Sequence, residues 1–212
     1  MDHQHKKLAI LCASVFVIPA LVCAGIAAQK GDKEARTDEK RPIDDIVRYL
    51  KQEGVGLSDE KLKALAGHVY QESLVNEVDY RLVLAVMKIE SNFKGEAVSP
   101  KGARGLLQVK PSLAKDICKD AGVQWTGNDT LHEPDKNIKL GVYHLSQLIE
   151  DFGNLANALH AYNTGSTRAK ANISSNKNRP TPRFARMVMQ EYERNASVLP
   201  HPEPKLTVLG YR

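Results

Sequence analysis

Cysteine is scarce in this chain, and the few cysteines are not placed to cross-link a domain. The 212 residues contain three of them. Cys12 and Cys23 fall in an apolar segment near the start, so Cys118 is the one cysteine in the rest of the sequence. We therefore expect no intramolecular disulfide in the folded domain. Cys118 lies in an apolar helical pattern, and we interpret it as a small core residue.

Several motifs with well-defined chemistry are also missing. The sequence has no glycine-rich phosphate loop, no G-x-S-x-G nucleophile motif and no Cys or His pair at metal-binding spacing. It contains one Trp and 6% aromatic residues, which are not interleaved with basic residues as in nucleic-acid binders. The sequence thus predicts no metal site, no cofactor and no nucleic-acid partner.

Composition and charge are typical of a basic globular protein. Hydrophobic residues make up 42% and charged residues 26%, with a formal net charge of +5. A chain of this length can form one domain with a substantial core and short appendages. The positive charge favours a polyanionic partner, such as nucleic acid, anionic lipid or an acidic wall polymer, and does not choose among them.

The N-terminal segment predicts export. Lys6 and Lys7 precede residues 8–28, which carry no charge and end in small residues. This order is typical of a signal peptide, and the run is nearly long enough to act as a membrane anchor. We favour cleavage, because Pro19 and the small residues after it suit a signal peptidase. The mature chain is then expected in the periplasm or cell envelope.

From residue 42 onward the sequence has helical periodicity. Apolar residues recur at i, i+3, i+4 and i+7, and clean alternation with a period of two is absent. We predict a mainly α-helical domain over 42–199, after a polar linker at 29–41 and before a proline-rich tail at 200–212. Helices are expected near 42–53, 59–69, 80–93, 111–122, 134–152, 155–161 and 184–192, with a polar loop at 163–182.

Glu90 is the residue whose position most needs an explanation. It directly follows the apolar stripe of Leu82, Ala85, Val86 and Ile89, at the C-terminal end of a predicted helix. Burial and the partly negative helix end both disfavour an ionised carboxyl, so we expect a raised pKa. A glutamic acid that is protonated near neutral pH can donate a proton to a glycosidic oxygen. On local pattern alone, a solvated Glu is the simpler interpretation.

Three short motifs, the first of which contains Glu90, occur in the order and spacing of a known family. They are I-E-S-N-F at 89–93, A-V-S-P-K-G-A-R-G-L-L-Q at 97–108 and A-Y-N-T-G at 161–165. Over about 78–188 the sequence resembles the lytic transglycosylases of the soluble (SLT) type, which are related in fold to goose-type lysozyme. Three motifs in register are more specific than any one of them. The resemblance implies a lysozyme-like helical domain with a substrate cleft.

The resemblance also implies roles for individual residues. Glu90 takes the position of the family's catalytic acid. Ser99 is expected to face the N-acetyl group of the muramoyl sugar, and Arg104 only to support the turn before Gln108. We expect the hydroxyl of Tyr162 to lie beside the carboxyl of Glu90, which it can orient by a hydrogen bond. The full set of implied substrate-binding residues is Ser91, Ser99, Gln108, Tyr162 and Asn163.

By the same resemblance, the substrate is the β-1,4 bond between N-acetylmuramic acid and N-acetylglucosamine in peptidoglycan. Glu90 acts first as acid and then as base, and the product ends in 1,6-anhydro-N-acetylmuramic acid. If Glu96 or Asp116 serves as a second carboxylate, the enzyme is a hydrolytic muramidase instead. A secretion-associated wall-binding module is a further alternative. The expected partners are glycan strands and a secretion, pilus or flagellar assembly, with the chain itself a monomer.

The sequence departs from the family pattern at two places. Leu107 replaces the usual Met of G-L-M-Q, which is a mild apolar exchange. Pro180 stands where relatives often carry Glu, and Phe184 where they carry Tyr. This second departure predicts the loss of a sugar-binding carboxylate on the cleft rim, with no effect on Glu90.

Overall fold

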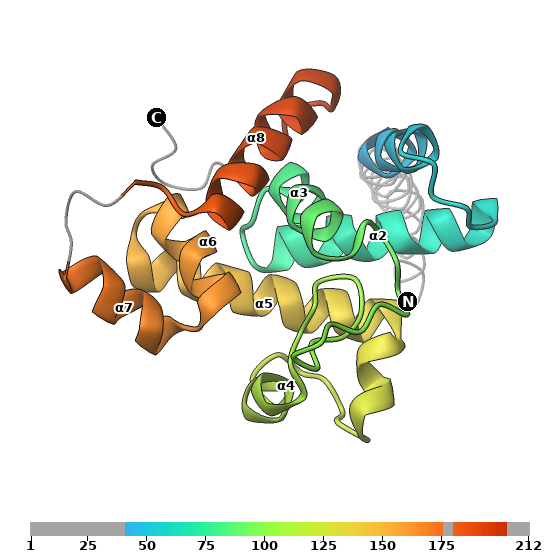
Figure 1. Ribbon diagram of the computed structural model, residues 1–212. Helices are drawn as coiled ribbons and strands as arrows, with labels where there is room; N and C mark the ends of the chain where they lie inside the picture. Colours follow the sequence, from blue (N-terminus) through green and yellow to red (C-terminus); the bar gives the residue numbers. More distant parts are fainter. Residues whose placement is uncertain (1–40, 176–179, 203–212) are drawn as a thin grey trace, which may run out of the picture. The chain divides into compact units, whose positions relative to one another are not determined.

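Helices make up most of the chain that the computed structural model describes, residues 41–175 and 180–202 (Figure 1). Extended backbone pairs in the described residues only at isolated bridges, which join Arg104 to Val98 and to Val109. The prediction of a mainly α-helical domain is confirmed. After a helix over residues 41–52, the elements are α2 (Asp59–Val75), α3 (Tyr80–Ser91), α4 (Pro111–Ile117), a 3-10 helix η1 (Asn128–His132), α5 (Pro134–Phe152), α6 (Leu155–Thr164), α7 (Ser166–Ser175) and α8 (Arg183–Val198).

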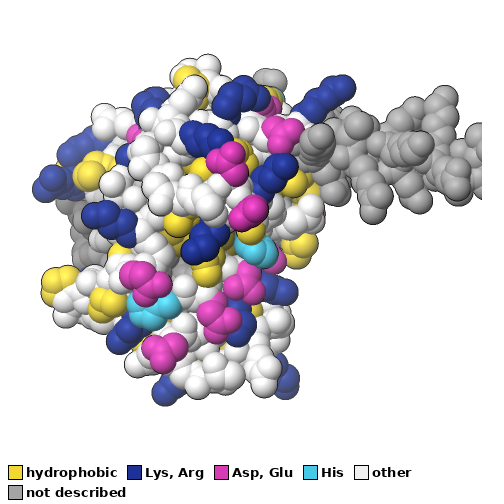
Figure 2. All heavy atoms as spheres, turned by 90° about the vertical axis from the view of Figure 1, so that its right-hand side faces the viewer, with side chains coloured by type: hydrophobic (Ala, Val, Ile, Leu, Met, Phe, Trp, Pro, Cys, Tyr) yellow, Lys and Arg dark blue, Asp and Glu magenta, His cyan; other side chains and the backbone are white. Residues whose placement is uncertain are grey.

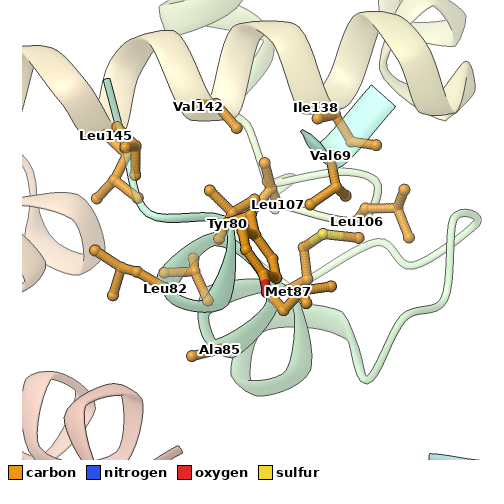
Figure 3. Close-up of a cluster of buried hydrophobic side chains, with 14 of the residues drawn as sticks. Val69, Tyr80, Leu82, Ala85, Met87, Leu106, Leu107, Ile138, Val142 and Leu145 are labelled. Carbon is orange, nitrogen blue, oxygen red and sulfur yellow. The ribbon is translucent and has the colours of Figure 1, made fainter. Parts of the chain in front are cut away.

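Helix α3 lies at the centre of the core. Its residues 80–87 are all buried, so no face of this part of the helix is left to solvent. Figure 3 shows Leu82 and Met87 of α3 in one cluster with Leu107 and with Val142 of α5. Helix α8 packs against α3, and α5 packs against α2 and α6. This packing fixes the C-terminal end of α3, which carries Glu90.

Local sequence signals set both ends of α3. The N-cap is Asp79, whose carboxylate accepts a hydrogen bond of 2.9 Å from the backbone N–H of Arg81. Asn92 follows the helix in the left-handed conformation, with φ 51° and ψ 43°, and its N–H donates to the carbonyl of Lys88. Asn tolerates this conformation better than most residues. The helix therefore ends just after Glu90, two residues earlier than predicted.

The segment 163–182 is more helical than the sequence predicts. Helix α6 runs through Thr164, and α7 begins at Ser166 directly after Gly165, whose φ is 89°. The prediction of a polar loop was therefore wrong for most of this segment. Ala169 is the buried residue of α7, and it packs in a small cluster with residues of α5 and α6. Tertiary packing rather than an apolar stripe stabilises α7, and periodicity does not reveal such a helix.

Other predicted boundaries shift by a few residues. Arg41 is already helical rather than part of the linker, and α4 ends at Ile117 rather than near residue 122. The start of the predicted tail packs on the domain, because the hydroxyl of Tyr80 donates to the carbonyl of Pro200 at 2.6 Å and Pro202 is buried.

Two predicted segments lie outside the described residues. They are the signal peptide or anchor at 1–28 with most of the linker, and residues 203–212 of the tail. Within the ranges that the structure does describe, no helix combines the length and the apolar character needed to cross a membrane.

Candidate active site

A cavity of about 540 Å³ has Glu90 in its wall. Two chain segments, 99–113 and 162–168, supply most of the wall, and α5 adds His144. The structure thus brings together residues that lie more than 70 positions apart in the sequence. Five of the six residues implied by the family resemblance line this cavity, namely Glu90, Ser99, Gln108, Tyr162 and Asn163.

Glu90 supplies the one carboxyl group among the described residues that line the cavity. Burial raises its pKa from 4.5 to about 7, and no neighbouring charge offsets the effect. At pH 7 about half of such groups carry a proton, against roughly 0.3% for an ordinary Glu. The raised pKa that the sequence predicts is confirmed, with burial as its cause. Glu90 is thus able to donate a proton and, once ionised, to accept one.

Tyr162 lies beside Glu90, but its hydroxyl group is used elsewhere. The hydroxyl donates a hydrogen bond of 2.7 Å to the carbonyl of Leu107. Burial and the nearby charge of Glu90 raise the pKa of Tyr162 well above 10. The ring also packs against His144, with centroids 5.6 Å apart and an interplanar angle of 36°. The expected hydrogen bond from Tyr162 to the carboxyl is therefore wrong for this structure, and Tyr162 instead connects α6 to the 105–108 loop.

The 105–108 loop is held by hydrogen bonds from three helices. The amide oxygen of Asn137 in α5 accepts from the backbone N–H of Leu107 at 2.9 Å. The hydroxyl of Ser91 in α3 donates to the carbonyl of Leu106 at 2.8 Å, and α6 adds the tyrosine bond described above. Ser91 is only 8% exposed and does not line the cavity. The structure thus does not bring Ser91 to the substrate side, and Ser91 positions the loop instead.

Two glycines allow this loop to approach α5 closely. A Cβ atom on Gly105, whose φ is 78°, would lie 2.2 Å from Nδ2 of Asn137 and 2.3 Å from the carbonyl oxygen of Leu131. A Cβ atom on Gly141 would lie 2.5 Å from Cδ1 of Leu107. Gly105 is thus required by contact as well as by conformation. The side chain of Leu107 fills the space that Gly141 leaves open.

Gln108 and Ser99 each use part of the side chain to hold the loop. Gln108 has a left-handed φ of 48°, and its Nε2 donates to the carbonyls of Ala97 at 3.1 Å and Gly105 at 2.9 Å. This arrangement leaves Oε1 to accept a hydrogen bond from a ligand. Ser99 Oγ accepts from the backbone N–H of Ala103 at 3.0 Å, so its hydroxyl hydrogen can still be donated. Backbone strain such as that at Gln108 is often found at functional sites.

His144 and Asn137 belong to the site, and the sequence interpretation missed both. His144 lines the cavity, and burial lowers its pKa from 6.5 to about 4, so the ring is neutral near pH 7. Asn137 makes the loop contacts described above. The two residues lie seven positions apart, on the same face of α5 as the buried Gly141. Polar residues at that spacing beside an apolar stripe are the signal that could have identified them.

No second carboxylate lines the cavity among the residues that the structure describes. The carboxylate of Glu96 is 86% exposed and lies 3.3 Å from Nδ1 of His132, and Asp116 is exposed. Arg104 also lies outside the wall, with Nη1 2.9 Å from Nε2 of His132. Pro180, where a rim carboxylate was expected to be missing, is exposed and does not line the cavity. A cluster of three or more His, Cys, Asp or Glu residues suited to a metal is likewise not found in 41–175 or 180–202.

Fold and site together define a lysozyme-like helical domain with one partly buried carboxyl group among the described residues of its cavity. Residues 69–184, more than half of the chain, match the family model described as the transglycosylase SLT domain. The chain belongs to this family.

Known relatives support the assignment over part of their length. The chain is 33% identical over 129 residues to the membrane-bound lytic murein transglycosylase C of Cronobacter sakazakii, and the match covers 56% of this chain and 36% of the relative. It is 37% identical over 92 residues to the protein of the same name from Salmonella typhi, covering 42% and 26%. The matched part therefore spans about a third or less of these relatives.

Two solved structures share the fold. The 70 kDa soluble lytic transglycosylase of Escherichia coli aligns with a TM-score of 0.60 and 20% identity, covering 77% of this chain and 31% of that one. An inactive mutant of the lytic transglycosylase Slt from Pseudomonas aeruginosa aligns with a TM-score of 0.56 and 23% identity, covering 73% and 28%. At this level of identity the similarity concerns the fold alone.

Proposed function

We propose that this chain is a peptidoglycan lytic transglycosylase in which Glu90 serves as the single acid and base. The observation that carries the proposal is that Glu90 is the one carboxyl among the described residues of the cavity wall, with its pKa raised to about 7 by burial. Ordinary retaining and inverting glycosidases require two carboxyl groups that flank the scissile bond. A site with one such group suits a reaction that uses it twice. Membership of the SLT family supports peptidoglycan as the substrate.

The first step is proton donation. Protonated Glu90 gives its proton to the oxygen between N-acetylmuramic acid and N-acetylglucosamine, and the bond from that oxygen to muramoyl C1 breaks. Positive charge develops on the muramoyl ring, and the acetamido group of the same sugar can stabilise it. Ser99 is suited to orient that group, because its hydroxyl hydrogen can be donated while Oγ is fixed by the backbone of Ala103.

The second step returns the proton to the enzyme. The carboxylate of Glu90 accepts the proton of the muramoyl C6 hydroxyl, and the C6 oxygen forms a bond to C1. The product is a 1,6-anhydro sugar, no water is consumed, and Glu90 is protonated again. Tyr162 and Gln108 line the same cavity as Glu90, and Asn163 is an exposed lining residue that we assign to sugar binding.

The products of a wall digest in water labelled with heavy oxygen test this reaction. A transglycosylase releases fragments that are lighter by one water than hydrolytic products and that carry no label at C1. A muramidase incorporates the label, which would overturn the single-carboxylate mechanism. Release of no soluble fragment would indicate a wall-binding module instead. Mass spectrometry of the digest separates the three outcomes.

A matched pair of variants tests the role of Glu90. Glu90→Gln is expected to remove cleavage while retaining binding to sedimented wall, because the amide keeps the shape but cannot donate the proton. Glu193→Gln, at an exposed position on α8, is expected to cleave like the parent. Equal cleavage by Glu90→Gln and the parent would contradict the mechanism.

We further propose that the chain acts in the periplasm or cell envelope as a monomer. The relatives named membrane-bound and the charge pattern of residues 1–28 support this location. Fractionation of producing cells tests it, and recovery in the cytoplasm alone would contradict it.

Recruitment by a secretion, pilus or flagellar assembly is a further proposal for residues 203–212. Deleting them should leave activity on purified wall unchanged while removing recruitment, and the deletion spares the buried Pro202.

A further inference from the structure

Three basic side chains line the cavity although proton transfer does not use them. Lys101 belongs to the turn that Ser99 begins, Lys110 precedes α4, and Arg168 lies in the first turn of α7. Both wall segments therefore contribute positive charge, and all three side chains are exposed. In the described residues none of the three forms an ion pair with a carboxylate.

The cavity differs in this respect from other parts of the surface. On the face drawn in Figure 2, Lys and Arg side chains are interspersed with Asp and Glu. Pairs such as Lys51 with Asp59, at 2.7 Å, balance charge elsewhere on the domain. Among the described residues of the cavity wall the one acidic residue is Glu90, and burial is the cause of its raised pKa. The positive charge of the wall thus remains available to a ligand.

We infer that Lys101, Lys110 and Arg168, which we term the basic rim, bind carboxylate groups that branch from the glycan. The chain would thereby select strands whose stem peptides carry free carboxylates over strands without them. This inference rests on the proposed function, because it requires a glycan strand in the cavity. The ammonium groups act as compact point charges, and the guanidinium can hold a carboxylate through two parallel hydrogen bonds.

Solvent exposure sets the size of the effect. An exposed ion pair contributes little, so we expect about two-fold in KM for each cation and on the order of ten-fold for all three. The effect falls on KM because the rim meets groups that do not change charge during the reaction. Salt weakens it, since the Debye length falls from about 30 Å at 0.01 M to about 3 Å at 1 M ionic strength.

The experiment compares two forms of one substrate. One form is a set of glycan oligosaccharides with stem peptides that carry free carboxylates, and the other is the same set after the carboxylates are converted to amides. For the full chain, we expect the KM on the amide form divided by the KM on the free-carboxylate form to be about ten at low salt. This KM ratio should approach one at about 1 M salt. The triple variant Lys101→Gln, Lys110→Gln, Arg168→Gln is expected to give a ratio near one at low salt.

Lys63→Gln provides the matched control, because Lys63 is an exposed lysine of α2 that does not line the cavity. It should keep the ratio of the parent. The three single variants should each lower the ratio about two-fold, which keeps the test decisive if the triple variant folds poorly.

Two results would overturn the inference without touching the proposed function. They are equal KM values of the parent on the two substrate forms, and an unchanged ratio in the triple variant while both forms are cleaved. If the parent cleaves neither form, the proposed function itself fails, and the inference fails with it. A ratio that is lost in the triple variant and retained in Lys63→Gln supports the basic rim.

Discussion

Replacing Glu90 with Gln should stabilise the folded chain at neutral and higher pH while removing activity. The folded carboxyl has a pKa of about 7 because it is partly buried and loses contact with water, against 4.5 for an ordinary Glu. Each unit of difference between the two pKa values corresponds to about 1.4 kcal/mol, so ionised Glu90 lowers the stability of the folded state by about 3 kcal/mol. Gln has a similar shape and no charge to desolvate.

The sign of the pH dependence follows from proton binding. Between pH 4.5 and about 7 the folded chain holds a proton on Glu90 that the unfolded chain has lost. The free energy of unfolding of the parent therefore decreases as pH rises through this window. Below the window Glu90 is protonated in both states and contributes nothing. Above it the full cost is present.

Urea unfolding of both proteins across this pH range measures the effect. The stability of Glu90→Gln relative to the parent should rise by about 3 kcal/mol between about pH 4 and about pH 8, or by about 6–12 °C in Tm for a domain of this size. Glu193→Gln, at an exposed position, controls for the loss of one carboxyl group. An offset for Glu90→Gln that does not vary with pH would refute the claim that burial raises the pKa of this carboxyl.

Four further substitutions test the supports of the site. Tyr162→Phe leaves a loop carbonyl unpaired and should lower the free energy of unfolding by about 1–3 kcal/mol in urea titrations. Asn137→Ala removes the hydrogen bond that Asn137 accepts from Leu107 and the one that it donates to the carbonyl of Arg104. It should lower the free energy of unfolding by at least about 2 kcal/mol in the same assay. Gly105→Ala forces a Cβ to 2.2 Å from Nδ2 of Asn137, so we expect a loss of more than about 3 kcal/mol, seen as a lower Tm or insoluble protein. His144→Phe keeps a ring beside Tyr162 and should not move the midpoint of the pH–rate profile, because His144 is neutral near pH 7.

Most helices could be predicted because their apolar periodicity agrees with the packing they adopt. The stripe of Leu82, Ala85 and Val86 indicated α3 correctly, although the structure buries every face of this helix from 80 to 87. Helix α7 could not be predicted in the same way. Its stability depends on one buried alanine, Ala169, and on packing against α6, neither of which produces a periodic pattern.

The candidate site was predictable where short motifs place a residue on a loop or at a helix end. Glu90, Gln108 and Tyr162 line one cavity, as expected. Hydrogen-bond direction could not be predicted, since it depends on distances between elements far apart in the sequence. The hydroxyl of Tyr162 therefore binds a backbone carbonyl rather than the carboxyl, and Ser91 positions the loop rather than the substrate.

The cations of the wall were missed for a related reason. Lys101, Lys110 and Arg168 are separated by 67 positions from first to last and share no motif, so only the fold brings them to one cavity. Their charges add to the net charge of the chain, but the sequence does not show where in the fold they lie. Charge on exposed side chains becomes informative once the elements that carry it are placed.

The pH dependence of kcat/KM for glycan cleavage tests the central claim most directly. If partly buried Glu90 must be protonated to start the reaction, kcat/KM should fall about ten-fold per pH unit above a midpoint near 7, the pKa that Glu90 has in the free enzyme. A midpoint near 4.5, or a rate that stays constant well above pH 8, would contradict the account, because the proton donor would then be a different group or one that is not buried.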